Sequence, residues 1–276
     1  MVVLKRRVLV RCAEGRNHMS WWRGLTRWSR PGGGMTSHPY VVVALLMLLI
    51  LGAFVLLGPT LAYPVLAIIA IVVLTRAHWW RRIGFTYSRR DAPRLLLVAP
   101  VLVLPALWWL VVAPRIGYGQ VHISSFALLA FYAGFTLLIG FVEEVYFRGL
   151  MLQALKPRGI WQATVLISLL FGVSHSLNLL AGAAPLYTLL QLGYATAFGL
   201  AFAALVWVTG LIWPVILAHA LTDFAAALNS AGGLISTTVT PTDYAITAFS
   251  VLFFSTYAII LLATVRGKEA PSKQLG

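Results

Sequence analysis

Two adjacent glutamates and an arginine lie inside an apolar stretch of the chain, in the sequence EEVYFR at 143–148. A charged side chain near the middle of a membrane helix costs roughly 2.5 to 3.5 kcal/mol on insertion scales, so each one requires a partner or a function. Later apolar stretches contain two histidines and an aspartate that raise the same question. The six side chains that could carry chemistry are Glu143, Glu144, Arg148, His175, His219 and Asp223.

Helical geometry separates the roles of the two glutamates, because adjacent residues on an α-helix point about 100° apart. Glu144 and Arg148 are four residues apart and share one face. This spacing predicts an ion pair that lets both charges exist at low dielectric, and such a pair is more typical of structure than of chemistry. Glu143 then faces elsewhere, without a partner on its own helix. We therefore expect Glu143 to act as a general base or acid.

The histidine motifs supply further groups for the same site. His219 and Asp223 are four residues apart in HALTD, so Asp223 is expected either to accept a hydrogen bond from the imidazole or to point into the site beside it. In FGVSH, Phe171 precedes His175 by one turn and is a candidate aromatic wall that contacts substrate. Each histidine taken alone is more typical of a hydrogen bond between helices than of catalysis.

A carboxylate and two imidazoles could activate a water molecule directly, or could hold a divalent metal that activates its bound water. The residues leave both versions open. If a metal such as zinc is bound, the candidate ligands are His175, His219 and Asp223. Cys12 is the only cysteine, which excludes disulfide frameworks and thiolate zinc sites.

The elements that must position these residues are membrane helices. The 276-residue chain is 60% hydrophobic and only 10% charged, and its mean hydropathy is +0.88, which excludes an ordinary soluble fold. Apolar runs of roughly 20 residues, the length needed to cross a bilayer, predict eight helices. They fall at about 39–58, 60–77, 93–114, 124–155, 160–180, 186–208, 211–229 and 244–264.

The sequence thus predicts an all-α, polytopic membrane bundle. We expect a basic N-terminal tail over 1–38, a transmembrane domain over 39–264 with its catalytic core at about 124–229, and a C-terminal tail over 265–276. Counted from the turn KPRG at 156–159, Glu143 and His175 lie roughly 20 and 24 Å into their helices, and His219 lies about 12 Å into its own. Three helices can therefore converge on one buried polar site.

The formal net charge of +14 is a signal of topology. With the N-terminus inside, all but one of the 21 lysines and arginines fall on cytoplasmic segments, and only Arg115 lies outside. This bias is what the positive-inside rule predicts, so both termini are expected in the cytoplasm. Anionic lipid headgroups suffice as partners of the basic residues, and we expect no nucleic acid. The sequence does not predict an oligomeric state.

The three motifs together resemble those of the type II CAAX prenyl endopeptidase and bacteriocin-processing (CPBP, or Abi) family of intramembrane proteases. That family carries EExxxR, FxxxH and HxxxN or HxxxD on membrane helices, within a bundle of about eight helices. Here the motifs read EEVYFR, FGVSH and HALTD. The resemblance covers about residues 124–229. It implies a metalloprotease that cleaves a hydrophobic or lipid-modified membrane substrate.

By this resemblance, Glu143 is the base that activates water for attack on a peptide carbonyl, and Glu144 and Arg148 support it. His175 and His219 would steady the water, the oxyanion or a metal. Asp223 stands where many relatives have asparagine, which adds a negative charge and makes metal binding more plausible than oxyanion donation from that position.

Two other classes of function use the same groups. A proton-coupled membrane transporter would use the carboxylates and imidazoles as a relay, and a catalytically silent immunity or scaffold protein would retain the motifs for packing. Other classes of intramembrane protease are excluded, because the chain has no HExxH, no GxSxG and only one aspartate deep in its apolar spans. An intramembrane endopeptidase is the leading hypothesis.

Overall fold

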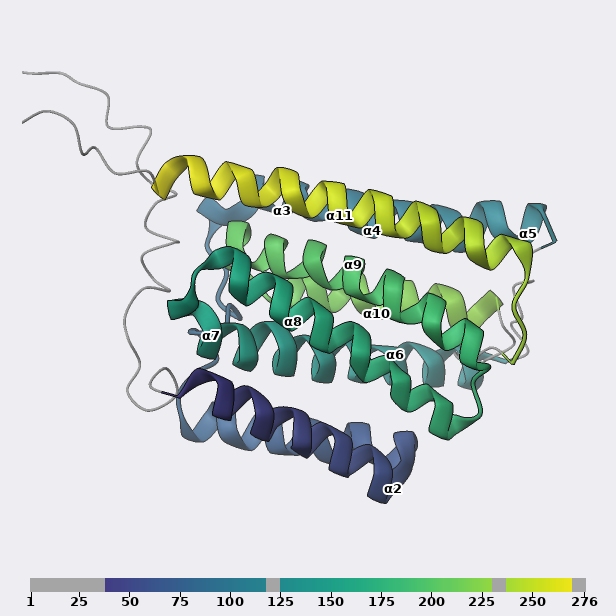
Figure 1. Ribbon diagram of the computed structural model, residues 1–276, viewed down its shortest axis with the longest axis horizontal. Coiled ribbons are helices and arrows are strands. Elements are labelled where there is room, and N and C mark those ends of the chain that lie inside the picture. Colours follow the sequence, from purple (N-terminus) through teal and green to yellow (C-terminus); the bar gives the residue numbers. More distant parts are fainter. Residues whose placement is uncertain (1–37, 118–124, 230–236, 270–276) are drawn as a thin grey trace, which may run out of the picture.

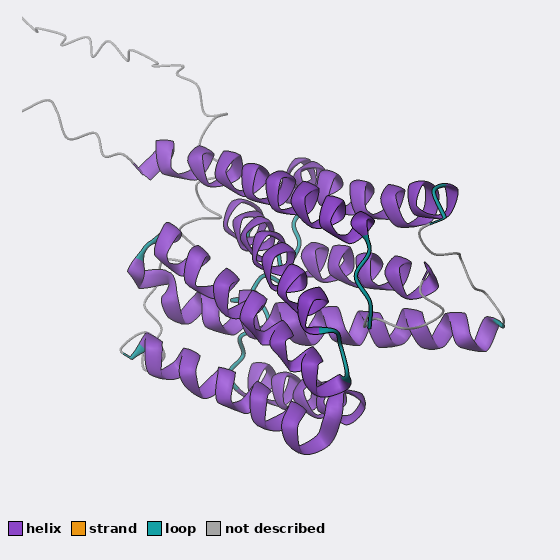
Figure 2. Cartoon of the chain, turned by 45° about the vertical axis from the view of Figure 1, so that its right-hand side comes forward, coloured by secondary structure: helices purple, strands orange, loops and turns teal. Residues whose placement is uncertain are grey.

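The structure is a computed structural model that describes residues 38–117, 125–229 and 237–269. These residues form a bundle of helices with no strand (Figure 1), and Figure 2 shows the same helices from a second direction. The prediction of an all-α membrane bundle is confirmed. The expected N-terminal tail, apart from His38, and the last seven residues of the expected C-terminal tail lie outside the described residues.

Six helical stretches of the described chain are long and apolar enough to cross a membrane. Trp213–Leu228 is apolar but shorter. The stretches consist of α2 (Pro39–Arg76); α3 (Ala92–Leu95), η2 (Leu96–Val98), α4 (Ala99–Leu107), η3 (Trp108–Val112) and α5 (Ala113–Arg115); α6 (Phe126–Glu144), η4 (Val145–Met151), α7 (Leu152–Leu155) and η5 (Lys156–Arg158); α8 (Ile160–Ser174) and η6 (His175–Ala181); α9 (Pro185–Thr209); and α11 (Pro241–Glu269). The shorter helix is α10 (Trp213–Asn229), and the short turn η1 (Arg89–Asp91) precedes α3.

The helix α2 folds back on itself at Gly58, where φ is 68° and ψ is 166°. Such a backbone conformation suits glycine, and Pro59 begins the next helix. The rings of Phe54 and Tyr63, nine residues apart, lie 5.0 Å from each other across the turn. A continuous helix would separate them by about 13 Å along its axis. Residues 39–57 and 59–76 are thus two spans.

Contacts at the ends of α2 agree with this reversal. Tyr40, at its start, accepts a hydrogen bond from Gln162, and the carbonyl of Arg82, just past its end, accepts one from Gln153. Both partners lie next to the short η5 turn, so both ends of α2 lie at one end of the bundle. With α2 counted as two spans and α10 included, the described residues contain the eight apolar helices that the sequence predicts.

The fourth predicted span is not one regular helix. It begins as α6, widens into the π-helical segment η4, and ends as α7 and η5. All side chains from Glu144 to Leu155 are buried. Segments of π-helix are rare and are found mostly at functional sites. The sequence pattern did not reveal this one, because the run 124–155 is apolar enough for a single regular span in spite of its three charged residues.

Close contact between two helix backbones brings α10 onto α6. A Cβ atom at Gly140 would lie only 2.9 Å from the carbonyl oxygen of Ile216 and 3.2 Å from the amide nitrogen of Ala220. Only glycine permits this approach without displacing one helix. The contact sets the depth of His219, which lies one residue before Ala220, opposite the end of α6.

The two ends of the bundle differ in charge. The start of α2, η5 and the end of α11 lie at one end, whereas α5 and the start of α11 lie at the other (Figure 1). We call the first the basic end, because its segments carry Arg76, Arg81, Arg82, Arg89, Arg94, Lys156 and Arg158. The second, which we call the far end, has Arg115. The final helix continues to Glu269, five residues past the predicted boundary.

Candidate active site

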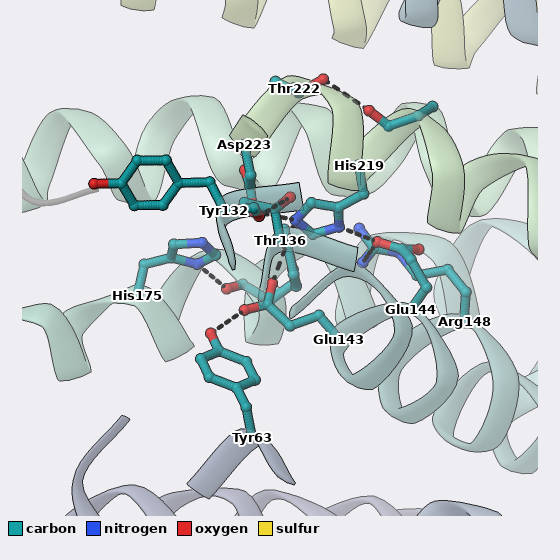
Figure 3. Close-up of polar contacts among 12 residues, drawn as sticks. Tyr63, Tyr132, Thr136, Glu143, Glu144, Arg148, His175, His219, Thr222 and Asp223 are labelled. Carbon is teal, nitrogen blue, oxygen red and sulfur yellow. Dashed lines mark hydrogen bonds and ion pairs between the residues drawn. The ribbon is translucent and has the colours of Figure 1, made fainter. Parts of the chain in front are cut away.

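The predicted side chains gather at the middle of the bundle (Figure 3). Glu143 comes from the end of α6, His175 follows α8, and His219 and Asp223 come from α10. These four side chains line one cavity, and Glu144 and Arg148 lie behind it. The convergence of three helices on one polar site is therefore observed.

His219 lies between the two glutamates. Its Nδ1 is 2.7 Å from Oε1 of Glu144, and because a carboxylate can only accept, Nδ1 donates this hydrogen bond. Its Nε2 faces the cavity, 3.6 Å from Oε2 of Glu143 and 3.6 Å from Oδ2 of Asp223. These two distances are too long for direct hydrogen bonds. Glu144 thus fixes the ring, and Nε2 is turned toward two carboxylates in the cavity.

Glu144 and Arg148 form the ion pair that their spacing predicts. The Nη1 atom of Arg148 donates to Oε1 of Glu144 at 2.9 Å, and both side chains are fully buried. The guanidinium also lies 4.1 Å from the centre of the ring of Phe171, a favourable cation–π distance. Removing either charge would leave the other buried without compensation, which is strongly destabilising. The pair thus orients His219 from the side of the ring that faces away from the cavity.

Glu143 has a partner that the sequence did not reveal. The hydroxyl of Tyr63, in the second half of α2, donates to Oε1 of Glu143 at 2.7 Å. The other oxygen, Oε2, is buried and has no hydrogen-bond partner among the described residues. The expectation that Glu143 lacks a partner on its own helix is correct, but another helix supplies one. The only sequence signal for this contact was a tyrosine inside the apolar run 60–77.

His175 is oriented by the backbone of its own helix. Its Nδ1 lies 2.8 Å from the carbonyl oxygen of Phe171, which can only accept, so Nδ1 carries the proton and Nε2 is left for other partners. The ring packs edge-on against Phe171 at 4.9 Å, and the ring of His219 lies 6.0 Å from the same phenylalanine. Phe171 is fully buried in the cavity wall, and its ring also packs edge-on against Phe147 at 5.1 Å.

The cavity that these residues line has a volume of about 1220 Å³. This exceeds the range of about 300 to 1,000 Å³ that is typical of sites for small molecules. Its wall is largely apolar and aromatic, with a few polar groups that the motifs do not include. Among these, Asn178 donates a hydrogen bond to Gln191 at 2.8 Å, and Tyr132 and Tyr194 lie along the wall. A cavity of this size and polarity suits several residues of a hydrophobic peptide.

The donor atoms do not form a recognisable metal centre. Among the described residues, no group of three or more histidine, cysteine, aspartate or glutamate side chains is arranged so that it could hold a metal ion. The residues therefore do not fit a three-ligand site, and we derive no chemical step through a metal.

Comparison with known proteins identifies the segment that holds the site. Residues 125–225 match the family model described as type II CAAX prenyl endopeptidase Rce1-like. The matched segment is a little over a third of the chain and contains all six polar motif residues. The family resemblance is confirmed over this segment. No curated protein and no solved structure matches the chain.

Proposed function

We propose that the protein is an intramembrane endopeptidase that hydrolyses a peptide bond in a hydrophobic or lipid-modified membrane substrate. The observation that carries this proposal is the pair of facing atoms, Oε2 of Glu143 and Nε2 of His219, at the wall of a large apolar cavity. The family match supports a protease of the CAAX type.

In the proposed reaction Glu143 is the general base. Its Oε2 takes a proton from a water molecule as the water oxygen bonds to the peptide carbonyl carbon. The C–N bond then breaks, and the proton passes to the leaving amine. Tyr63 holds the other carboxylate oxygen, so that Oε2 keeps a fixed position toward the substrate.

The two imidazoles act on the same intermediate. His175 can accept a hydrogen bond at Nε2 from the attacking water, because its Nδ1 carries the proton. His219, when protonated, donates from Nε2 to the oxyanion. Glu144 stabilises that protonated form through Nδ1, and Arg148 holds the Glu144 carboxylate in place. Asp223 adjoins Nε2 and can only accept while it is ionised, so we assign it to orienting His219 and the water.

A metal-assisted reaction is the second version of this proposal. If a divalent metal such as zinc were bound, His175, His219 and Asp223 would be the residues that hold it, and it would act as a Lewis acid that activates water. The donor geometry supports this version less well than direct activation by Glu143. The two versions predict different effects of a chelator, which we describe in the Discussion.

The decisive variant is Glu143→Gln, which keeps the size of the side chain and removes the base. Purified wild type and variant would be compared on a panel of hydrophobic membrane peptides, with products identified by mass spectrometry. We expect turnover to fall by about 10² to 10⁴-fold. Asp91→Asn is the matched control, because Asp91 pairs with Arg94 at the basic end and should tolerate the same change. Equal turnover by Glu143→Gln and wild type would remove Glu143 from the chemistry.

A further inference from the structure

The cavity extends from the site toward one end of the bundle only. Beyond Glu143 and His219 its wall continues through the start of α9 to residues near the far end. Those residues include Trp109 in η3, Asn178 in η6, Thr240 just before α11 and Asp243 in its first turn, and Thr60 lines the wall next to the turn of α2. No residue of α7 or η5 lines it, and neither does any of residues 260–265 in α11.

The bundle is closed between the site and the basic end. Every residue from Glu144 through η4 and α7 to Leu155 is buried. Phe202 and Leu205, on the central helix α9, are also fully buried at this level. A substrate arriving from the basic end would have to displace this layer of buried side chains, and buried side chains in proteins are close-packed.

The hairpin of α2 is shorter than the helices beside it and leaves the cavity uncovered past its turn. Tyr63, at the level of the site, is four residues from Pro59, so the hairpin extends only about 6 Å beyond it. On α6, by contrast, Glu143 is 17 residues from Phe126, so this helix extends about 25 Å beyond the site. The neighbouring helices therefore rise above the turn of α2 and leave their inner faces uncovered on that side. Thr60 and Phe131, which line the cavity there, are both exposed.

We propose that substrate reaches Glu143 from the far end, which the distribution of basic residues assigns to the extracytoplasmic side of the membrane. The substrate class is then a hydrophobic or lipid-anchored polypeptide whose scissile bond is presented at the extracytoplasmic leaflet. This inference rests on the proposed protease function for the identity of the ligand. The packed layer at η4 and α7 closes the route from the basic end.

Accessibility of single cysteines tests the route without requiring activity. Cys12, the only native cysteine, would first be replaced by serine. Three single-cysteine variants would then be made in this background as reporters. They are His175→Cys in the site, Thr60→Cys at the turn of α2, and Ala77→Cys, which is exposed at the basic end. Right-side-out and inverted membrane vesicles would be treated with a small, anionic, membrane-impermeant thiosulfonate, and the mass shift of each variant followed over time.

We expect His175→Cys and Thr60→Cys to react at least tenfold faster in right-side-out vesicles, and Ala77→Cys to react faster in inverted ones. Asn178→Cys, which also faces the cavity, serves as a second reporter if His175→Cys does not fold. Modification of the site cysteine from the same side as Ala77→Cys, or from neither side, would overturn the proposed route. If the wild type shows no protease activity on the peptide panel, the proposed function is refuted, but the labelling result still reports the route into the cavity.

Discussion

Glu143 holds its two carboxylate oxygens in different surroundings, and this asymmetry is what a general base requires. Oε1 accepts a hydrogen bond from Tyr63, whereas Oε2 faces Nε2 of His219 without a direct hydrogen bond. A base that must take a proton from a water molecule needs one oxygen unoccupied and the side chain fixed. Tyr63 is thus a positioning residue that acts through Glu143.

Removing the phenol hydroxyl should slow the reaction more than it weakens substrate binding. A hydrogen bond to a charged group contributes about 1.5 to 3 kcal/mol, so we expect Tyr63→Phe to lower kcat by at least about tenfold with KM changed less than about twofold. Tyr146→Phe is the matched control, because its hydroxyl donates only to the backbone carbonyl of Leu66. Steady-state kinetics would measure both variants, and an unchanged kcat in Tyr63→Phe would argue against the positioning role.

Direct activation of water by Glu143 has a consequence for metal dependence. We expect the purified protein to hold well under one zinc per chain and to keep its turnover after treatment with a strong chelator. Asp223→Asn should then retain activity within about tenfold, because an amide preserves the shape of the side chain beside His219. Elemental analysis and kinetics would check this. Stoichiometric zinc together with loss of activity in the chelated protein and in Asp223→Asn would establish the metal-assisted version.

Sequence reasoning could predict the motif residues of the site but not their partners from distant segments. Glu144 and Arg148 are four residues apart, so helical geometry alone predicts that they pair. Tyr63 and Glu143 are 80 residues apart, and no local rule joins them. Asn178 and Gln191 were missed for a related reason. Neutral polar side chains are common in membrane helices, and nothing in their spacing marks these two as part of a cavity wall.

The helices themselves could be predicted, because a bilayer forces every span to be long, apolar and hydrogen-bonded within itself. Departures from regular helical geometry could not be predicted. The π-helical segment η4 and the end of α8 at Ser174, one residue before His175, lie within spans whose overall apolar character does not mark them. Both irregularities occur where motif side chains are placed. Their backbone geometry depends on packing between helices, which hydropathy does not describe.

The contact between α6 and α10 at Gly140 is the element-scale feature on which the site depends. In Gly140→Ala the new methyl group would lie 2.9 Å from the carbonyl oxygen of Ile216, so α10 must shift away from α6. We expect a loss of stability of about 1 to 3 kcal/mol and a fall in turnover of at least tenfold, because His219 would move away from both glutamates. Thermal unfolding in detergent and kinetics would measure these effects.

Gly134→Ala provides the matched control on the same helix. A Cβ atom at Gly134 meets no atom within 4 Å, so the substitution adds helix propensity without a clash and should leave stability equal or higher by up to about 1 kcal/mol. Equal effects of the two substitutions would show that the close approach at Gly140 does not set the position of His219.

Across the whole molecule, the family match covers less of the chain than the site does. Residues 125–225 contain the motifs, but α2 supplies Tyr63 and part of the cavity wall, and α4, η3 and α11 supply other parts of it. The packed layer on the basic side also distinguishes the functions considered for this chain. A proton-coupled transporter needs a polar path to both faces, and the described residues open the cavity toward only one.

The contribution of α2 can be tested by dividing the chain between Thr86 and Tyr87, where the described backbone is not helical. Membrane helices form independently and then associate, so separately expressed fragments can assemble. We expect fragment 87–276 alone to be inactive, because Glu143 loses Tyr63 and the cavity loses one wall. Co-expression with fragment 1–86 should restore cleavage, and fragment 1–86 carrying Tyr63→Phe should restore about a tenth of it or less. Full activity from fragment 87–276 by itself would mean that the catalytic unit does not include the first hairpin.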